Sequence, residues 1–385
     1  MIEIIYPVPE ILPDSRARFI QIINTCYALS KMGLNVNLIT GIKTGFSTKD
    51  LYQFYGLKPC ETFKIIKLPI LRRQKAKYLK ISWNGLFYLF FLKFLYNSSK
   101  AKKCLIFLRH IKLARFLLNF KKFFKMPMIF EVHEIFYLNK KKQANLKQTE
   151  IEIYKNMDAL ICISFKLKEF LIDNFKINEK KISVVHDAVR NEWFKIKKDH
   201  ENSYICYTGS LYQWKGVDIL ISAMKYLPDE KLLIIGGGDR LNELKKLVME
   251  EDISNRVIFT GYVPHSLIPE YLSKAKIAVL PNVAEGPSQF SSPLKLFEYM
   301  AAGIPIVASD LPVFKEVLQN EETAIFFETG NPKALADAIK KVLDSKELAE
   351  KLSKNAKKNA ENYTYEKRAE KIYIALMEIF KNLKC

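Results

Sequence analysis

Short apolar runs alternate with longer helical patterns along the 385 residues of this chain. The apolar run at 2–8 is followed by a helical pattern at 16–33 that ends at Gly33, and a second apolar run occupies 35–40. This order is typical of a βαβ unit, whose strands lie parallel in one sheet. The alternation continues with apolar runs at 104–108, 128–133, 159–164 and 181–188. The first half is therefore predicted to be an α/β domain.

The alternation starts again at Tyr204. Strand patterns occupy 204–210, 231–239, 255–263, 276–282 and 323–328, with helical patterns between them. The polar stretch 191–203 is interpreted as a linker. The predicted fold class is α/β, with two doubly wound Rossmann-like domains, 1–190 and 191–365, facing each other across a cleft. Open sheets of this kind bind ligands at the carboxyl ends of their strands.

The stretch 291–312, SSPLKLFEYMAAGIPIVASDLP, places two charges in an apolar helical pattern. Ser292 suits a helix N-cap and Pro293 the first helical position, so a helix is expected to begin near Pro293. Its free amides and Lys295 would form an anion site fit for a diphosphate. Glu298 lies one turn deeper, where a carboxylate can accept hydrogen bonds from the vicinal hydroxyls of ribose. The alternative is a surface Lys–Glu pair worth about 0.2–0.5 kcal/mol, which the apolar surroundings disfavour.

Two further loops follow predicted strands and lead into helices. TGSLYQWKG at 208–216 places Lys215 near a helix N-terminus, where the helix dipole disfavours a cation unless an anion shares the site. GGGD at 236–239 is a glycine turn that would let a phosphate approach the next helix. A solvated lysine and an ordinary βα loop remain the alternatives.

Several catalytic motifs are absent from the sequence. There is no G-x-x-x-x-G-K-[ST] phosphate loop and no G-x-S-x-G nucleophile elbow. His133 and Glu134 open like a zinc-protease motif, but Tyr137 stands where its second histidine would be. There is also no D-x-D to hold a metal against a diphosphate, so neither a metal nor another cofactor is expected.

Charge is distributed unevenly along the chain, which has a formal net charge of +20. Residues 51–150 contain 22 Lys/Arg against 4 Asp/Glu, whereas 201–350 contain 15 against 21. The basic half could meet nucleic acid, an anionic membrane or an acidic ligand. The six cysteines stand singly and no signal peptide is visible at the N-terminus, so a cytoplasmic location is expected.

The strongest membrane candidate is the apolar stretch 81–96, ISWNGLFYLFFLKFLY. Its sixteen residues are interrupted by Asn84 and Lys93, and a bilayer span needs about 20. One interpretation is a helix packed on a sheet. The other is an interfacial helix that the basic stretch 71–80, LRRQKAKYLK, attaches to anionic headgroups.

The sequence resembles the family-4 retaining glycosyltransferases of GT-B architecture. The resemblance rests on TGSLYQWKGVD, LLIIGGGD, VIFTGYVP with LIPEYLSKAKIAVLP after it, and SPLKLFEYMAAGIPIVASD, in matching order across 204–312. The first half fits more loosely, through the pattern from Gln21 to Val36 and through FEVHE at 130–134. The closing helix, 366–385, resembles the family's final helix, which crosses back to the first domain.

The resemblance implies a retaining, metal-independent hexosyltransferase with an acceptor-binding first domain and a donor-binding second domain. It implies catalytic roles for His133, Lys215 and Glu298, with His133 facing the transferred sugar. The donor, a UDP-sugar or GDP-sugar, would be bound by Gly209, Ser210, Lys215, Gly236, Gly237, Arg240, Tyr262, Val263, Ser292, Pro293, Leu294, Lys295 and Glu298. The departing phosphate oxygen would help to take the acceptor proton.

The sequence departs from the family pattern at three places. Phe290 stands where the family has a second glutamate that contacts the donor sugar, and the nearby Glu285 is out of register. Ser210 stands where an arginine is usual, so Arg240 or Lys295 would have to supply the missing cation. The first loop, PEILPDSRARF, contains no glycine.

The expected acceptor is a lipid-linked or membrane-associated glycan of cell-envelope polysaccharide or lipopolysaccharide type, reached from the cytoplasmic face of the membrane. The basic half would dock on anionic lipid, and nucleic acid is not expected as a partner. The alternatives are a sugar-nucleotide epimerase of GT-B fold, a non-catalytic basic protein that binds nucleic acid, and a catalytically dead scaffold. The sequence determines neither the donor base and sugar nor the acceptor.

Overall fold

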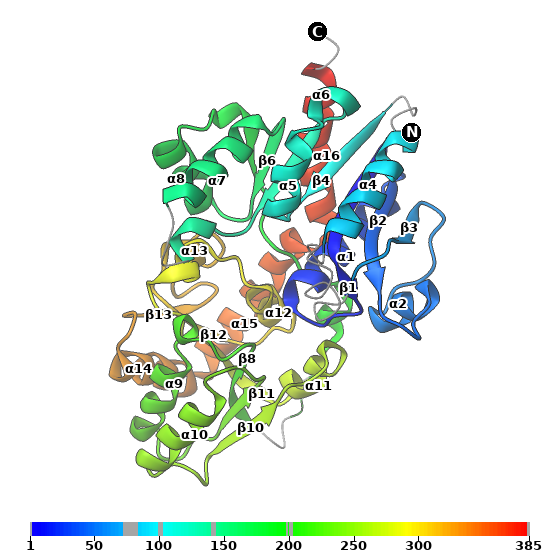
Figure 1. Cartoon of the computed structure of the whole chain (residues 1–385). Helices are drawn as coiled ribbons and strands as arrows, with labels where there is room; N and C mark the ends of the chain where they lie inside the picture. The colour runs from blue at the N-terminus through cyan, green and yellow to red at the C-terminus, as the bar shows by residue number, and fades with distance from the viewer. Residues whose placement is uncertain are drawn as a thin grey trace. The chain divides into compact units, whose positions relative to one another are not determined.

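The computed structural model describes residues 2–71, 84–98, 103–139, 144–197, 199 and 203–382. The chain forms two compact units, each built on a parallel sheet with helices beside it (Figure 1). Unit 1 comprises 1–163, 167–185 and 365–385, and unit 2 comprises 164–166 and 186–364. The predicted α/β class with two doubly wound sheets is confirmed.

Unit 1 contains a seven-stranded sheet in the order β3-β2-β1-β4-β5-β6-β7. Its strands are β1 (Glu3–Leu12), β2 (Asn35–Ile42), β3 (Phe63–Lys67), β4 (Cys104–Leu108), β5 (Met128–Val132), β6 (Ala159–Cys162) and β7 (Ile182–Val184). Its helices are α1 (Ala17–Lys31), α2 (Thr48–Phe54), α4 (Gly85–Ser98), α5 (Ile111–Leu118), α6 (Lys121–Phe124), α7 (Ala144–Asn156), α8 (Phe165–Phe175) and α16 (Tyr365–Asn382). Glu3 of β1 pairs with Asn35 of β2 and Cys104 of β4, so the strand order reverses at β1 and the loops after β1 and β4 emerge at one edge.

Unit 2 contains a six-stranded sheet in the order β10-β9-β8-β11-β12-β13. Its strands are β8 (Tyr204–Thr208), β9 (Leu232–Ile235), β10 (Val257–Gly261), β11 (Ala275–Leu280), β12 (Ile306–Ser309) and β13 (Ile325–Phe327). Its helices are α9 (Val217–Ala223), α10 (Leu241–Glu250), α11 (Ile268–Ser273), α12 (Leu294–Ala301), α13 (Pro312–Lys315), α14 (Pro332–Leu343) and α15 (Lys346–Ala360). The order reverses at β8, which brings the loops after β8, β9 and β11 together.

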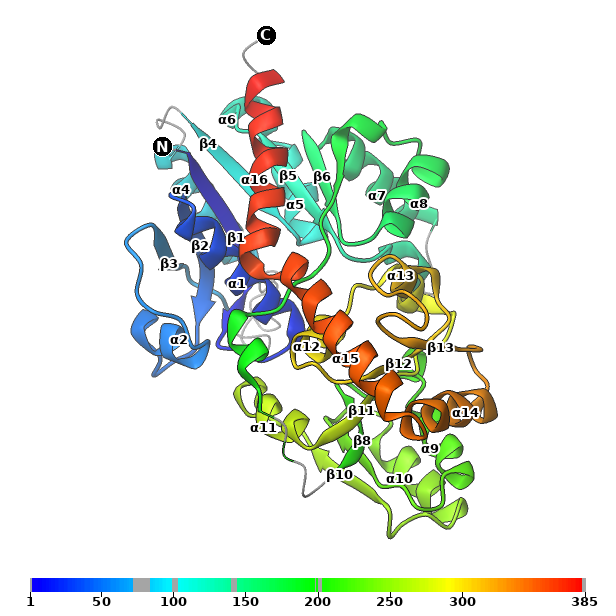
Figure 2. The same ribbon diagram turned by 180° about the vertical axis from the view of Figure 1, so that it is seen from behind.

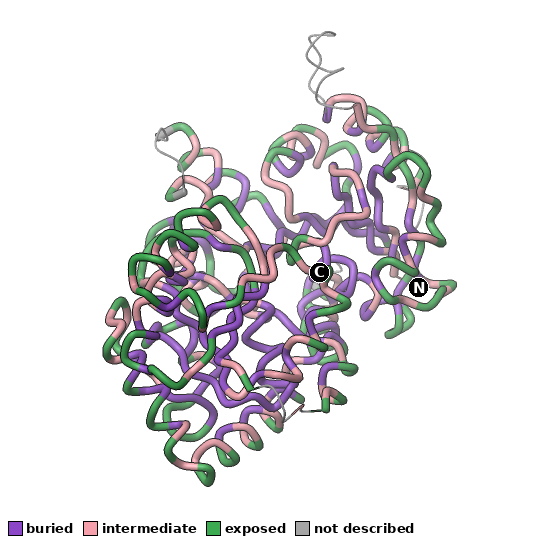
Figure 3. The backbone as a smooth tube through the Cα atoms, turned by 90° about the horizontal axis from the view of Figure 1, so that it is seen from below, coloured by how far each residue is buried: buried purple, intermediate pink, exposed green. Residues whose placement is uncertain are grey.

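The strands read as almost unbroken apolar runs because helices cover both faces of a parallel sheet. Buried backbone is concentrated in the interior of each unit (Figure 3). The C-terminal helix α16 returns to unit 1 and packs against α1 (Figure 2). Its Arg368 reaches the interior of that unit, where its guanidinium forms an ion pair with Glu131 of β5.

The interpretation of 191–203 as a linker is wrong for its first part. Residues Asn191–Lys195 form a short 3-10 helix of unit 2, and Trp193 is buried there. The Trp193 ring lies 5.3 Å from the ring of His265. The polar composition of the stretch concealed this single aromatic anchor.

The helix expected within 81–96 is α4, which the structure describes from Asn84 onward. Most of the basic stretch 71–80 and the residues 81–83 lie outside the described residues. Within the part of the chain that is described, no helix combines the length and the apolar character needed to cross a bilayer.

Candidate functional site

In unit 2, the loop after β8 runs directly beside the loop after β9. Gly209 N donates to Ile235 O at 2.8 Å, and Leu211 N donates to Gly237 O at 3.1 Å. A Cβ atom on Gly236 would lie 2.1 Å from Gly209 O, and Gly236 has a φ of +138°. Both the close approach and the backbone conformation therefore require glycine at 236.

Lys295 of α12 lies beside this pair of loops. Its Nζ is 3.6 Å from the centroid of the Tyr207 ring. A Cβ atom on Gly209 would lie 3.7 Å from the same Nζ. The residue is only 7% exposed, and its Nζ has no hydrogen-bond partner within the described part of the chain. Burial, and secondly the charge of Lys215, lower the pKa of Lys295 well below its ordinary value. A buried ammonium without a partner is costly, so its position is suited to an anionic ligand.

Lys215 supplies a second cation close to the first. It ends the short 3-10 helix Gln213–Lys215, and its Nζ lies 3.7 Å from the centroid of the Trp214 ring. Burial lowers the pKa of Lys215 to about 7. A Cβ atom on Gly216 would lie 1.9 Å from Pro281 O, so the loop after β11 packs against the turn that carries Lys215. The charge of Lys215 acts on Lys295, so the two side chains lie close enough to share one anionic ligand, as the sequence predicted.

The first turn of α12 begins one residue later than predicted. Pro293 is the N-cap, with no side-chain cap, and the helix runs from Leu294 to Ala301. The Ser292 hydroxyl does not cap α12, since Ser292 precedes the N-cap, and it accepts a hydrogen bond from Asp187 N at 3.0 Å. The amides of Leu294 and Lys295 belong to the first turn, where a helix offers no carbonyl to accept them. They add partial positive charge beside the Lys295 ammonium.

Glu298 lies one turn further along α12 and is buried. Its Oε1 lies 2.6 Å from Nε2 of His265, which follows β10. The sequence predicted that the Glu298 carboxylate accepts two hydrogen bonds from a ribose. One of its two oxygens, Oε1, already contacts His265. The remaining oxygen can still accept hydroxyl groups. His265 was missed because a single histidine after a strand carries no recognisable spacing.

The other predicted donor residues fall into two groups. Tyr262 is exposed and lies next to Gly237, since a Cβ atom on that glycine would be 3.6 Å from Tyr262 N. Val263 is half-buried against the core of unit 2. Gly209 and Ser210 are exposed in the loop after β8. Arg240 is already bound, since its guanidinium contacts Glu243 at 2.6 Å and Asp218 at 3.4 Å. It therefore does not supply the free cation that the sequence suggested.

A buried phenylalanine, Phe290, occupies the position where the family has its second glutamate. Phe290 ends the 3-10 helix Gly286–Phe290 and is buried, while Glu285 is exposed. Asn282, fully buried in the loop after β11, donates to Ser288 Oγ at 3.3 Å. Its Oδ1 has no partner among the residues that the structure describes, so Asn282 is a polar group at this edge that the sequence did not indicate.

Unit 1 contains a separate cavity of about 340 Å³ at the carboxyl edge of its sheet. The cavity is formed where strand β1 and the first turns of α1 meet the segments that follow β4 and β5. The residues that line it are Tyr6, Pro7, Val8, Pro9, Glu10, Arg18, Ile22, Asn84, Arg109, His110, Ile111, Lys112, Glu131, His133, Glu134 and Phe136. His133 thus lines a cavity, and its contact with a sugar stays a prediction.

A buried carboxylate lies beside His133, whose Nε2 makes no hydrogen bond with the residues that the structure describes. Glu131 Oε2 lies 3.2 Å from His133 Nε2 and accepts a hydrogen bond from the Tyr6 hydroxyl at 3.1 Å. Glu131 Oε1 accepts from Gln21 at 3.0 Å and pairs with Arg368. Burial lowers the pKa of His133 to about 4, so the ring is neutral at physiological pH and can act there as a hydrogen-bonding group rather than as a cation.

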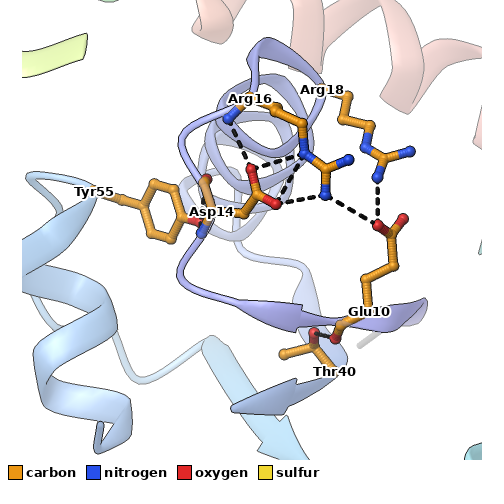
Figure 4. A network of polar contacts seen from close by, with 6 residues as sticks. All are labelled: Glu10, Asp14, Arg16, Arg18, Thr40 and Tyr55. Carbon is orange, nitrogen blue, oxygen red and sulfur yellow. Dashed lines mark hydrogen bonds and ion pairs between the residues drawn. The ribbon is translucent and has the colours of Figure 1, made fainter. Parts of the chain in front are cut away.

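The glycine-free loop between β1 and α1 is held by ion pairs (Figure 4). Arg16 contacts Asp14 through Nε at 3.0 Å and Glu10 at 3.3 Å, and Arg18 also pairs with Glu10. The Tyr55 hydroxyl accepts from Asp14 N at 2.9 Å. Charged side chains thus fix a loop that the family pattern would fill with glycine.

The depressed pKa of Lys215 makes ligand binding dependent on pH. Below about pH 7 the Lys215 ammonium is charged, and above it the charge is lost unless a bound anion restores it. The affinity for a nucleotide-diphosphate sugar, whose pyrophosphate does not titrate there, should therefore fall by up to about tenfold per pH unit above pH 7. Titrations between about pH 6 and pH 9 test this expectation. A flat profile, or the same slope in Lys215→Met, would contradict it.

Two family models match adjacent parts of the chain. Glycosyl transferases group 1 matches residues 189–359, and Glycosyltransferase Family 4 matches residues 20–193. Together the two matches extend from 20 to 359, which confirms the resemblance seen in the sequence.

Relatives and solved structures agree with these matches. The chain is 30% identical over 190 residues to an O-antigen chain mannosyltransferase of Salmonella typhimurium, covering 49% of this chain and 52% of the relative. It is 27% identical over 259 residues to the UDP-Gal:alpha-D-GlcNAc-diphosphoundecaprenol alpha-1,3-galactosyltransferase of Escherichia coli. This match covers 62% of this chain and 65% of the relative. The matches span between half and two thirds of these relatives' length. Sucrose-phosphate synthase from Thermosynechococcus elongatus shares the fold, with a TM-score of 0.78, 19% identity and coverage of 99% and 100%.

Proposed function

Because the chain belongs to the group 1 glycosyltransferases of family 4, we propose that it transfers a hexosyl group from a UDP-sugar or GDP-sugar to a glycan, with retention at the anomeric carbon. One observation carries the donor assignment. The Lys295 Nζ is buried beside Gly209 and the first turn of α12 with no hydrogen-bond partner among the residues that the structure describes, a position that a pyrophosphate would fill. Glu298, oriented by His265, would then accept hydroxyls of the ribose.

The proposed chemistry uses fixed charges around the leaving group. Negative charge develops on the diphosphate as the sugar–phosphate bond breaks, and donors already aimed there lower the barrier. Lys215, Lys295 and the first-turn amides of α12 would supply this stabilisation. The departing phosphate oxygen would take the acceptor proton, so no separate base is assigned. Neutral His133 would orient a hydroxyl of the transferred sugar through the hydrogen bonds its ring can form.

The proposed acceptor is a glycan linked to a lipid or associated with the cytoplasmic face of a membrane. The name of the Escherichia coli relative specifies a UDP-Gal donor and a diphosphoundecaprenol-linked acceptor, and the Salmonella typhimurium relative is named for O-antigen. These names support an acceptor of the cell-envelope type for this chain. They do not select the sugar or the linkage.

Transfer should persist after divalent metals are removed, because two lysines already supply the positive charge that a metal would add. Turnover in excess EDTA should stay within about twofold of turnover in Mg²⁺, a difference of under about 0.5 kcal/mol in barrier. A strict requirement for Mg²⁺ or Mn²⁺ would contradict the proposed donor site. The control is a metal-dependent glycosyltransferase, which must lose its activity in the same EDTA buffer.

A thermal-shift panel of UDP-sugars and GDP-sugars in EDTA tests the function as a whole. A donor at about 100 times its Kd should stabilise the protein by about 2.7 kcal/mol. Product analysis of the best donor, incubated alone and with polyprenyl-diphosphate glycans, then identifies the reaction. Transfer with a retained anomer supports the proposal. Epimerised donor in the absence of acceptor would favour the epimerase alternative, and no stabilisation by any donor would overturn the donor site.

A further inference from the structure

Helix α4 is apolar on both of its faces. Its inner face buries Phe87, Phe91 and Leu95 in unit 1. Its outer face carries Leu89 at 64%, Phe90 at 43% and Tyr96 at 53% exposure. A surface helix normally presents polar residues to water, and α4 contains no acidic residue and one lysine. The outer face of α4 is therefore an exposed apolar surface that the core of unit 1 does not explain.

A chain of mostly buried aromatic rings links α4 to α6 beneath the surface. The rings of Tyr88 and Phe116 lie 4.9 Å apart, those of Phe116 and Phe120 5.3 Å apart, and those of Phe120 and Phe124 6.4 Å apart. Phe123, next to Phe124, is 67% exposed. Phe124 is buried, and the other three rings are partly buried. The exposed side chains along this aromatic strip are Leu89 and Phe90 next to Tyr88, Tyr96 of the same helix, and Phe123 next to Phe124, and we call them the α4–α6 face.

The α4–α6 face is surrounded by positive charge. Residues 62–130 contain 17 Lys/Arg and no Asp/Glu. Lys93, Arg115, Lys122 and Lys125 are exposed around the strip. Within the described part of the chain none of these four cations has an ion-pair partner, whereas Lys121 is neutralised by Asp158 at 2.9 Å.

We propose that the α4–α6 face docks on the interfacial region of an anionic bilayer. Exposed aromatic and aliphatic side chains would enter the boundary between headgroups and acyl chains, and the surrounding lysines and arginine would contact anionic headgroups. A nucleic acid would use the cations but would gain little from a branched aliphatic side chain such as Leu89. The proposal goes beyond sugar transfer, because lipid binding by this face requires neither donor nor turnover.

Co-sedimentation of the full chain with vesicles tests the proposal. Binding to vesicles of phosphatidylcholine with phosphatidylglycerol should exceed binding to phosphatidylcholine alone by at least about tenfold at low salt. The double variant Leu89→Ser/Phe90→Ser and the double variant Lys122→Glu/Lys125→Glu should each weaken binding to the anionic vesicles by about tenfold. Met249→Ser on α10, which removes a side chain that is also 64% exposed, is the matched control and should bind as the wild type does.

Three outcomes would overturn the proposal. Equal binding to both vesicle types would remove the role of charge, and unchanged binding by both double variants would place any lipid contact elsewhere. Single-stranded RNA that competes fully with the vesicles, and that Leu89→Ser/Phe90→Ser binds as tightly as the wild type, would mark the face as a nucleic-acid surface. Because the donor residues are not altered, each variant should keep the wild-type thermal shift with its nucleotide sugar, so loss of lipid binding is separable from failure of the proposed function.

Discussion

Lys295→Met should lower kcat/KM for sugar transfer by about 10²- to 10³-fold, the effect of removing one preorganised donor from a developing negative charge. The same variant should raise the melting temperature of the donor-free protein. The wild-type Nζ is buried and has no hydrogen-bond partner within the described part of the chain, so replacing it with an apolar chain of similar length removes a desolvation cost. Activity assays and calorimetry of the same protein samples measure both effects.

Lys245→Met is the matched control for this substitution. Lys245 is an exposed lysine of α10 in the same unit, and its replacement should leave activity and melting temperature close to the wild-type values. Near-wild-type transfer by Lys295→Met would remove Lys295 from the donor site. A lowered melting temperature would show that the ammonium contributes to folding rather than to ligand binding.

Arg368→Met should destabilise the fold by about 3–5 kcal/mol, the usual cost of leaving one partner of a buried ion pair behind. Glu131 and Arg368 are both almost completely buried. The substitution would leave the Glu131 carboxylate with Tyr6 and Gln21 as uncharged partners. Chemical denaturation of the donor-free protein, followed by fluorescence, measures the loss.

A double variant shows whether the loss of stability in Arg368→Met comes from the unpaired charge of Glu131 or from lost packing. Glu131→Gln/Arg368→Met should recover most of the stability, because the double variant leaves no buried charge without a partner. Lys367→Met on the same helix breaks an exposed pair with Glu370 and should cost less than about 1 kcal/mol. If Arg368→Met cost no more than this control, the buried network would not stabilise the unit.

The alternation of apolar runs and helical patterns was sufficient to predict two parallel sheets, because buried parallel strands require almost unbroken apolar sequence. The edge strand β3, FKIIK, gave no such signal, since two of its five residues are lysines. The polar stretch after 190 was interpreted as a linker because composition averages over a buried Trp193. Local composition thus identified the central strands more reliably than the edges and boundaries.

The candidate donor site was predicted from charged residues that stand within an otherwise apolar helical pattern. Lys295 and Glu298 stood out because they interrupt an apolar helix, and the structure buries both. The partners that tune them could not be predicted in the same way. His265 contacts Glu298 from 33 residues away, and Arg368 contacts Glu131 from 237 residues away. Such pairs are created by the folded topology, and neither partner has a recognisable spacing in the sequence.

Proton uptake on donor binding tests the central claim most directly. The claim is that Lys215, which is largely uncharged above about pH 7, becomes charged against a pyrophosphate that Lys295 also contacts, without a metal. Calorimetric titration of the preferred nucleotide sugar in EDTA at about pH 8, repeated in buffers of different ionisation enthalpy, should show uptake of about one proton or more. Lys295→Met should bind more weakly, and Lys215→Met should take up fewer protons. Tight binding in EDTA with no proton uptake, unchanged in Lys295→Met, would contradict the account.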